Sequence, residues 1–113
     1  PVLALQRDVR SLNDATDEQL DRMRAWCKLA PNNDGYTTCT GSILDSLFWG
    51  GENDFGVSIR YCSRAPDDDE KKACFWRMFD QARIYIPPHT KQEQLCAAVP
   101  GAYTAECRSI LSL

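Results

Sequence analysis

The segment Cys27-Lys-Leu-Ala-Pro31, with Cys39 eight residues after its proline, decides the fold because the same arrangement returns twice. The later copies are Cys62-Ser-Arg-Ala-Pro66 with Cys74, and Cys96-Ala-Ala-Val-Pro100 with Cys107. The first cysteines of successive copies lie 35 and 34 residues apart, a period typical of stacked helical hairpins. The sequence therefore predicts three helical hairpin units of the form C-x3-P-x6/7-C.

The proline of each unit places its two cysteines at facing helix ends. Proline disfavours helix at the residue before it, so one helix ends there and the next begins beyond it. The first cysteine then lies in the last turn of one helix, and the second lies early in the antiparallel helix that follows. Each bond would close a loop of roughly 11 residues and contribute about 3 kcal/mol. We predict the disulfides Cys27–Cys39, Cys62–Cys74 and Cys96–Cys107.

Composition limits the class of protein. The chain has 113 residues, enough for one domain spanning residues 1–113, and its apolar and charged fractions of 43% and 26% are those of a folded protein. A net charge of -3 gives no support to a nucleic-acid partner. No run of 18 apolar residues predicts a transmembrane segment. Six paired cysteines indicate an extracytoplasmic protein, periplasmic or secreted, whereas six buried thiols in a cytosolic protein are the alternative.

Helical periodicity covers nearly the whole chain and predicts an all-α fold. Capping boxes begin at Thr16 and Thr90, while Gly50-Gly51 and Pro87-Pro88 are helix stops. Residues 52–64 fit a strand or a helix, and the repeat register together with the lack of a partner strand favours helix. We expect six to seven helices, arranged as antiparallel hairpins in a compact disulfide-stapled bundle or short repeat array. The expected helices cover residues 1–12, 17–29, 36–49, 52–64, 66–86, 90–96 and 102–111.

The chain offers little material for catalysis, metal binding or cofactors. His89 is the only histidine and follows two prolines, and no serine has a nucleophile-elbow context. Residues 32–35 (Asn-Asn-Asp-Gly) fail the calcium-loop register and predict a turn. The acids of residues 67–70 fit the solvated N-terminus of a helix. The sequence therefore predicts no catalytic residue, no metal site and no cofactor.

Some aromatic residues are candidates for binding another protein. Most of them, Trp26 and Tyr85 included, are expected in the core or on the inner face of a helix. Residues 74–79 are apolar on more than one face of their helix, which is typical of a helix that covers a partner. Residues 48–51 (Phe-Trp-Gly-Gly) place a tryptophan at a helix end beside a flexible loop. The candidate partner-binding residues are Phe48, Trp49, Phe55 and Trp76.

Two resemblances bear on function. Over about residues 20–111, the three units resemble disulfide-stapled helical-hairpin repeat proteins found outside the cytoplasm, whose usual role is to bind other proteins. The segments Tyr36-Thr-Thr-Cys39-Thr-Gly41-Ser-Ile43 and Tyr85-Ile-Pro87 resemble small all-helical periplasmic immunity proteins, which neutralise peptidoglycan-cleaving toxins. The cysteine pattern departs from that family, so no site residue is carried over.

Three hypotheses for function follow. The first is a non-enzymatic, extracytoplasmic protein-binding module stabilised by three disulfides. The second is an inhibitor or immunity protein that neutralises a secreted or periplasmic enzyme or toxin. The third is a small secreted hydrolase or toxin that uses carboxylates, which would need two convergent acids and a raised carboxyl pKa.

Overall fold

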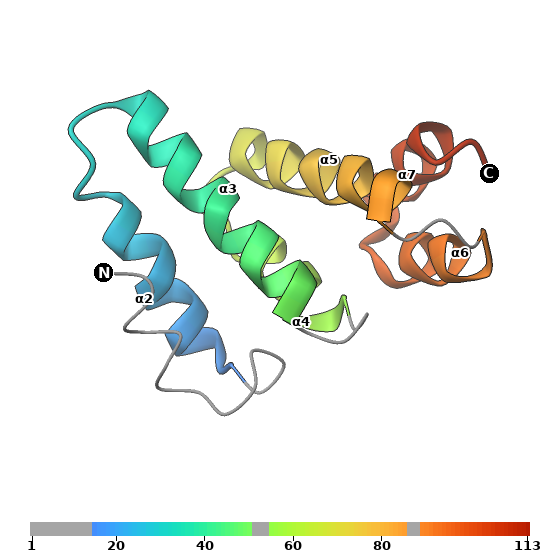
Figure 1. The fold of residues 1–113 in the computed structure, drawn as a ribbon, viewed down its shortest axis with the longest axis horizontal. Helices are drawn as coiled ribbons and strands as arrows, with labels where there is room; N and C mark the ends of the chain where they lie inside the picture. The colour runs from blue at the N-terminus through green and yellow to red at the C-terminus, as the bar shows by residue number, and fades with distance from the viewer. Residues whose placement is uncertain (1–14, 51–54, 86–88) are drawn as a thin grey trace. The chain divides into compact units, whose positions relative to one another are not determined.

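The computed structural model describes residues 15–50, 55–85 and 89–113, without the side chains of residues 48–50, and this described part is all-α (Figure 1). The chain divides into two compact units, residues 1–64 and 65–113. The single domain expected over residues 1–113 stays a prediction. The helix expected over residues 1–12 lies outside the described residues.

Unit 1 begins with α2 (Asp17–Cys27), whose predicted capping box is present. Thr16 Oγ1 accepts from the Gln19 backbone N–H at 3.1 Å, and Gln19 Oε1 accepts from the Thr16 N–H at 2.8 Å. The helix buries Leu20, Met23 and Cys27 along one side. These contacts set one face of α2 against the other helices of the unit.

The second helix, α3 (Asn33–Gly50), starts three residues earlier than predicted. Asn32 Oδ1 accepts from the Gly35 N–H at 2.8 Å, so the expected turn at residues 32–35 becomes a cap followed by the first helical turn. A Cβ at Gly35 would lie 3.1 Å from the Ala30 Cβ, so glycine permits this close approach. Further along, α3 buries Ile43, Leu44 and Leu47.

The next described helix of unit 1, α4 (Gly56–Ser63), shows that the ambiguous segment is helical over residues 56–63, while residues 52–54 lie outside the described part of the chain. It buries Val57, Ser58, Tyr61 and Cys62, and it contacts both α2 and α3. The Tyr61 hydroxyl donates to the Thr40 backbone carbonyl at 3.3 Å. Tyr61 of α4 therefore reaches α3 through its hydroxyl, while its ring is fully buried.

Unit 2 is built on α5 (Asp68–Tyr85), which begins with the acidic run as predicted. Asp67 Oδ1 accepts from the Glu70 N–H at 2.8 Å and so caps the helix. The core face of α5 carries Phe75, Met78, Phe79 and Ala82, all fully buried. The expectation that Tyr85 continues this face is wrong, because its side chain is exposed at the last residue of the helix.

The rest of unit 2 comprises α6 (His89–Ala98), the short 3-10 helix η2 (Gly101–Tyr103) and α7 (Thr104–Ile110). Thr90 lies inside α6, so the capping box predicted there is wrong, and the helix expected over residues 102–111 is divided between η2 and α7. The Tyr103 ring stacks on Phe75 with centroids 4.5 Å apart, and Phe79 lies 6.2 Å from Phe75. These aromatic rings form the centre of the unit.

Disulfides staple the helix pairs. Cys27–Cys39 joins α2 to α3 and Cys96–Cys107 joins α6 to α7, with Cα–Cα distances of 5.4 and 5.5 Å. The two remaining cysteines, Cys62 and Cys74, are disulfide-bonded as well, and none of the six is free. Among the residues described, no helix has the length and apolar character that crossing a membrane requires.

Candidate functional site

The structure describes two of the four predicted partner-binding residues fully. Phe48 and Trp49 belong to the end of α3, and their side chains lie outside the described part of the chain. Phe55 precedes α4 as its half-buried N-cap residue, and no side-chain hydrogen bond caps the helix there. Trp76 is 43% exposed on α5. Phe55 belongs to unit 1 and Trp76 to unit 2.

The repeat itself reveals a surface that sequence reasoning missed. The residue before the first cysteine is fully buried in the second and third hairpins, where it is Tyr61 and Leu95. In the first hairpin it is Trp26, which is 37% exposed, and nearby Leu29 is 80% exposed. We call Trp26 and Leu29 the α2 surface. The expectation that Trp26 belongs to the core is therefore wrong.

A buried arginine explains why the Trp26 side of α2 faces solvent. Arg24 is only 5% exposed, its Nη2 donates to the Tyr61 backbone carbonyl at 2.6 Å, and its guanidinium carbon lies 3.9 Å from the Tyr61 ring centre. Residues two apart on a helix point about 200° from each other. Burying Arg24 against α4 therefore points Trp26 outward. The sequence feature that could have indicated this exposed surface is Arg24, which lies between Met23 and Cys27 on the buried side of the helix.

The buried guanidinium is only partly satisfied by its neighbours. Arg24 Nε and Nη1 are buried and have no hydrogen-bond partner among the described residues. Its contact with Tyr61 combines one hydrogen bond with a cation–π interaction, and neither replaces a carboxylate. A buried cation without a bonded anion is costly. Arg24 therefore directs how α2 packs more than it stabilises the unit.

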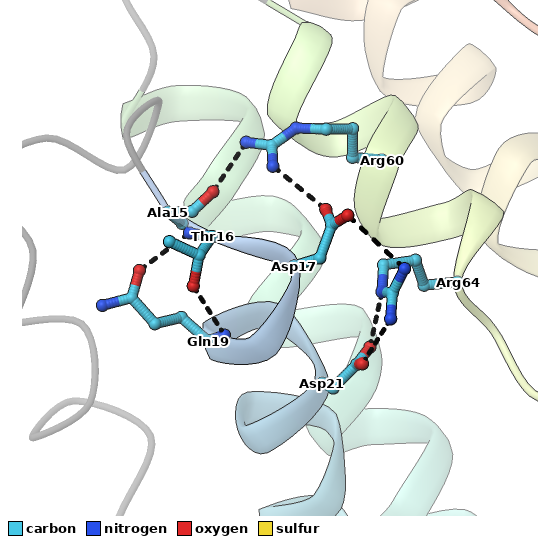
Figure 2. A network of polar contacts seen from close by, with 7 residues as sticks. All are labelled: Ala15, Thr16, Asp17, Gln19, Asp21, Arg60 and Arg64. Atoms are coloured by element: carbon cyan, nitrogen blue, oxygen red, sulfur yellow. Dashed lines mark hydrogen bonds and ion pairs between the residues drawn. The ribbon is translucent and has the colours of Figure 1, made fainter.

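At the surface, Arg60 of α4 and Arg64, the C-cap residue of α4, tie this helix to α2 (Figure 2). Arg60 donates to Asp17 Oδ1 at 3.1 Å and to the Ala15 carbonyl at 2.7 Å. Arg64 binds both carboxylate oxygens of Asp21, at 2.8 and 2.6 Å, and reaches Asp17 Oδ2 at 3.5 Å. Two acids one turn apart on α2 thus meet two arginines four residues apart at the C-terminal end of α4.

The electrostatics of this network do not suit proton transfer. The hydrogen bonds from Arg64 hold the pKa of Asp21 below its ordinary value of 3.8, because they favour the ionised carboxyl. A carboxyl that must donate a proton near neutral pH needs a pKa shifted the other way. Asp17 and Asp21 are convergent acids, but both are paired with arginine. Across the ranges the structure describes, no cluster of three or more His, Cys, Asp or Glu side chains could hold a metal ion.

Trp76 stands among charged side chains on the exposed side of α5. The Lys72 ammonium lies 4.6 Å from the centre of its ring, a cation–π contact one turn earlier in the helix. One turn later, Asp80 accepts from Arg83 Nη2 at 2.6 Å. Phe75, Phe79 and their neighbours fill the core face of α5, so Trp76 is apolar surface beyond what the core requires.

No known protein family, curated protein or solved structure matches this chain. The assignment of function therefore rests on the chain's own surfaces.

Proposed function

We propose that this chain is a non-enzymatic, extracytoplasmic protein-binding module that binds its partner through the α2 surface, Trp26 and Leu29. The observation that carries the proposal is the exposure of these two side chains, at 37% and 80%, where the other hairpins bury the residue equivalent to Trp26. Exposed large apolar residues that lie together are typical of protein–protein contact. Tryptophan is also the residue that most often dominates the energy of such contacts.

The α2 surface is held in place before any partner arrives. Cys27 directly follows Trp26, and its disulfide to Cys39 joins this end of α2 to α3. Backbone hydrogen bonds from Lys28 and Leu29 to the Ala25 and Trp26 carbonyls, each 3.1 Å, continue the helical path past the cysteine. A surface that is already ordered loses little conformational entropy on binding, which favours affinity.

The disulfides support the proposed extracytoplasmic location. All six cysteines are bonded, and disulfides persist in oxidising environments such as the periplasm or the extracellular space. Folding of the chain in an oxidising compartment should give a protein with no free thiol, as measured by alkylation and mass spectrometry. Equal stability of the fully reduced protein would contradict the extracytoplasmic proposal.

Affinity capture tests the binding role. The oxidised protein is immobilised and exposed to extracytoplasmic extract of its source organism, in parallel with a Trp26→Ser, Leu29→Ser double variant. Ile84→Ser is the matched control, because Ile84 is 58% exposed on a different helix. We expect wild type and control to retain one stoichiometric protein whose Kd rises at least about 30-fold in the double variant.

Each outcome of the capture experiment decides something. A partner retained equally by the double variant would remove the α2 surface from the proposal. Recovery of no partner at concentrations where micromolar binding would show contradicts the binding function itself. A captured hydrolase that loses activity in the complex would support binding and define the module as an inhibitor.

A further inference from the structure

The exposed side of α5 carries five residues placed symmetrically about Trp76. Lys72 and Asp80 lie four residues before and after it, and Asp69 and Arg83 lie seven residues before and after it. At 100° per residue, these side chains leave the helix within an arc of about 80°, over a length of about 21 Å. All five are exposed. We call them the α5 stripe.

The charges of the α5 stripe are self-complementary in one orientation only. Along the helix they run negative, positive, Trp76, negative, positive. In two antiparallel copies related by a twofold axis at Trp76, Lys72 of one copy lies level with Asp80 of the other, and Asp69 lies level with Arg83. Every charge then meets an opposite charge at its own height. Two parallel copies would instead set each charge beside its own kind.

We infer that a second copy of this chain binds the α5 stripe and forms a symmetric antiparallel dimer with the two Trp76 indoles at its centre. Lys72, Trp76 and Asp80 form one i±4 row, and two such rows pack together when helices cross at about -50°, the commonest packing class. A twofold axis uses the same surface on both partners, so the row must complement itself. The charge order around Trp76 meets that condition.

Contacts within one chain already hold the charged groups along this surface. The Lys72 ammonium lies 4.6 Å from the Trp76 ring centre, and Asp80 is paired with Arg83 at 2.6 Å. In the dimer, Lys72 keeps its place beside the indoles and gains Asp80 of the second copy. The interface extends an existing row of contacts without breaking the core packing of Phe75 and Phe79 on the adjacent face of α5.

The dimer is expected to be weak and sensitive to salt. One helix pair with a single tryptophan from each copy buries less than a standard protein interface, which places the Kd in the micromolar range or above. Ion pairs at an exposed rim are screened as ionic strength rises. Sedimentation velocity on the intact oxidised protein, from about 10 to about 500 μM, should show a dimer that weakens between about 50 mM and about 500 mM NaCl.

Two substitutions identify the surface. Trp76→Ala removes the apolar centre and should raise the Kd about tenfold or more. Leu29→Ala is the matched control, because Leu29 is a large exposed residue in the turn after α2, outside the α5 stripe, and the dimer Kd of this variant should stay unchanged. A wild-type protein that remains monomeric at the highest concentration in low salt overturns the inference. So does a dimer that Trp76→Ala leaves intact.

A charge-swap experiment tests the antiparallel pairing itself. Lys72→Glu alone places two acids level with each other in its homodimer, and Asp80→Lys alone does the same with two lysines, so each homodimer should weaken about tenfold or more. A mixture of the two variants restores opposite charges at both positions, and a heterodimer as strong as the wild-type dimer should form. Circular dichroism confirms that each variant is folded.

Mixing separates the inference from simpler explanations. Loss of the Lys72 contact with Trp76, or of the Asp80 pair with Arg83, would weaken a variant but could not be rescued by the other chain. Weak homodimers without a heterodimer would therefore overturn the pairing. Because the α5 stripe and the α2 surface share no residue, failure of this dimer leaves the proposed function standing, and the reverse also holds.

Discussion

Unit 1 and unit 2 use the same helical-hairpin repeat but hold it together differently. In unit 1, a buried arginine stacks on Tyr61 and two surface arginines of α4 bind two aspartates of α2. In unit 2, Phe75 lies between Phe79 and Tyr103, and the core face of α5 is apolar throughout. The comparison teaches that the cysteines and prolines set the hairpins, while the other residues of the helices decide whether polar or aromatic contacts hold each unit together.

The largest effect should come from the aromatic centre of unit 2. Phe75→Ala removes a fully buried ring that stacks on Tyr103, and should lower the free energy of unfolding by about 3–5 kcal/mol. Chemical denaturation followed by circular dichroism measures the loss. Phe75→Leu is the control, because it retains most of the volume and should cost less than half as much. A loss below about 1 kcal/mol for Phe75→Ala would mean that unit 2 does not depend on its aromatic core.

The two disulfides Cys27–Cys39 and Cys96–Cys107 should contribute equally to the free energy of unfolding, although the cores of the two units differ. Cys27–Cys39 and Cys96–Cys107 close loops with separations of 12 and 11 residues. Replacing both cysteines of either pair with alanine should therefore cost about 3 kcal/mol in each unit. Thermal unfolding of the two double variants makes the comparison. A difference greater than about 2 kcal/mol would show that local packing, and not loop closure, governs the contribution of a staple.

The buried arginine of unit 1 should behave unlike a core aromatic residue. Arg24→Met keeps most of the volume and removes a buried charge, so it should change the free energy of unfolding by no more than about 2 kcal/mol, toward greater stability. The Tyr61 carbonyl still accepts from the Arg64 N–H at 3.3 Å after the substitution. Arg24→Ala, which leaves a cavity, should be clearly less stable than Arg24→Met. If Arg24→Met unfolded the protein, the guanidinium would be essential to unit 1.

The smallest effect concerns the surface network and its pH dependence. Hydrogen bonds from Arg64 lower the pKa of Asp21 in the folded protein, so the carboxylate stabilises the fold above the ordinary value of 3.8. This stabilisation is lost as the pH falls through the lowered pKa of the folded state. Because Asp21 is half exposed, Asp21→Asn should cost no more than about 1 kcal/mol at neutral pH.

Acid titration of stability makes that prediction specific. The difference between wild type and Asp21→Asn should be constant at neutral pH and should shrink below pH 3.8, the ordinary pKa of the group. Glu18→Gln is a matched control on the same helix, since Glu18 is exposed and forms no part of the network in Figure 2. A difference that grows in acid would have the opposite sign and would contradict the pairing of Asp21 with Arg64.

Sequence reasoning located the hairpins because proline and cysteine act locally. The helical state of residues 56–63 and the cap at Thr16 both followed from spacing and periodicity. The start of α3 and the division at η2 were not predicted, because Asn32 caps from within an apparent turn and a 3-10 segment has no strong pattern.

The candidate surfaces were harder to predict than the hairpins. Periodicity finds the buried side of a helix only when that side is apolar, and α2 buries Arg24 while exposing Trp26. Trp76 was a sequence candidate for partner binding and that role stays a prediction, while its proposed partner is a second copy of the chain. The symmetric charge order around Trp76 can be read from the sequence, but its meaning depends on the exposed side of α5 that the structure defines.

The four-residue spacing shared by Asp17–Asp21 and Arg60–Arg64 also determines how α2 and α4 align. The two helices run in the same direction along this contact, with the first acid meeting the first arginine and the second meeting the second. Sliding α4 by one turn would leave one acid and one arginine facing solvent, with a single matched pair between the helices. Each ion pair of this network therefore adds little to the free energy of folding. Together, the pairs favour one alignment of α4 along α2 over the alignments shifted by one helical turn.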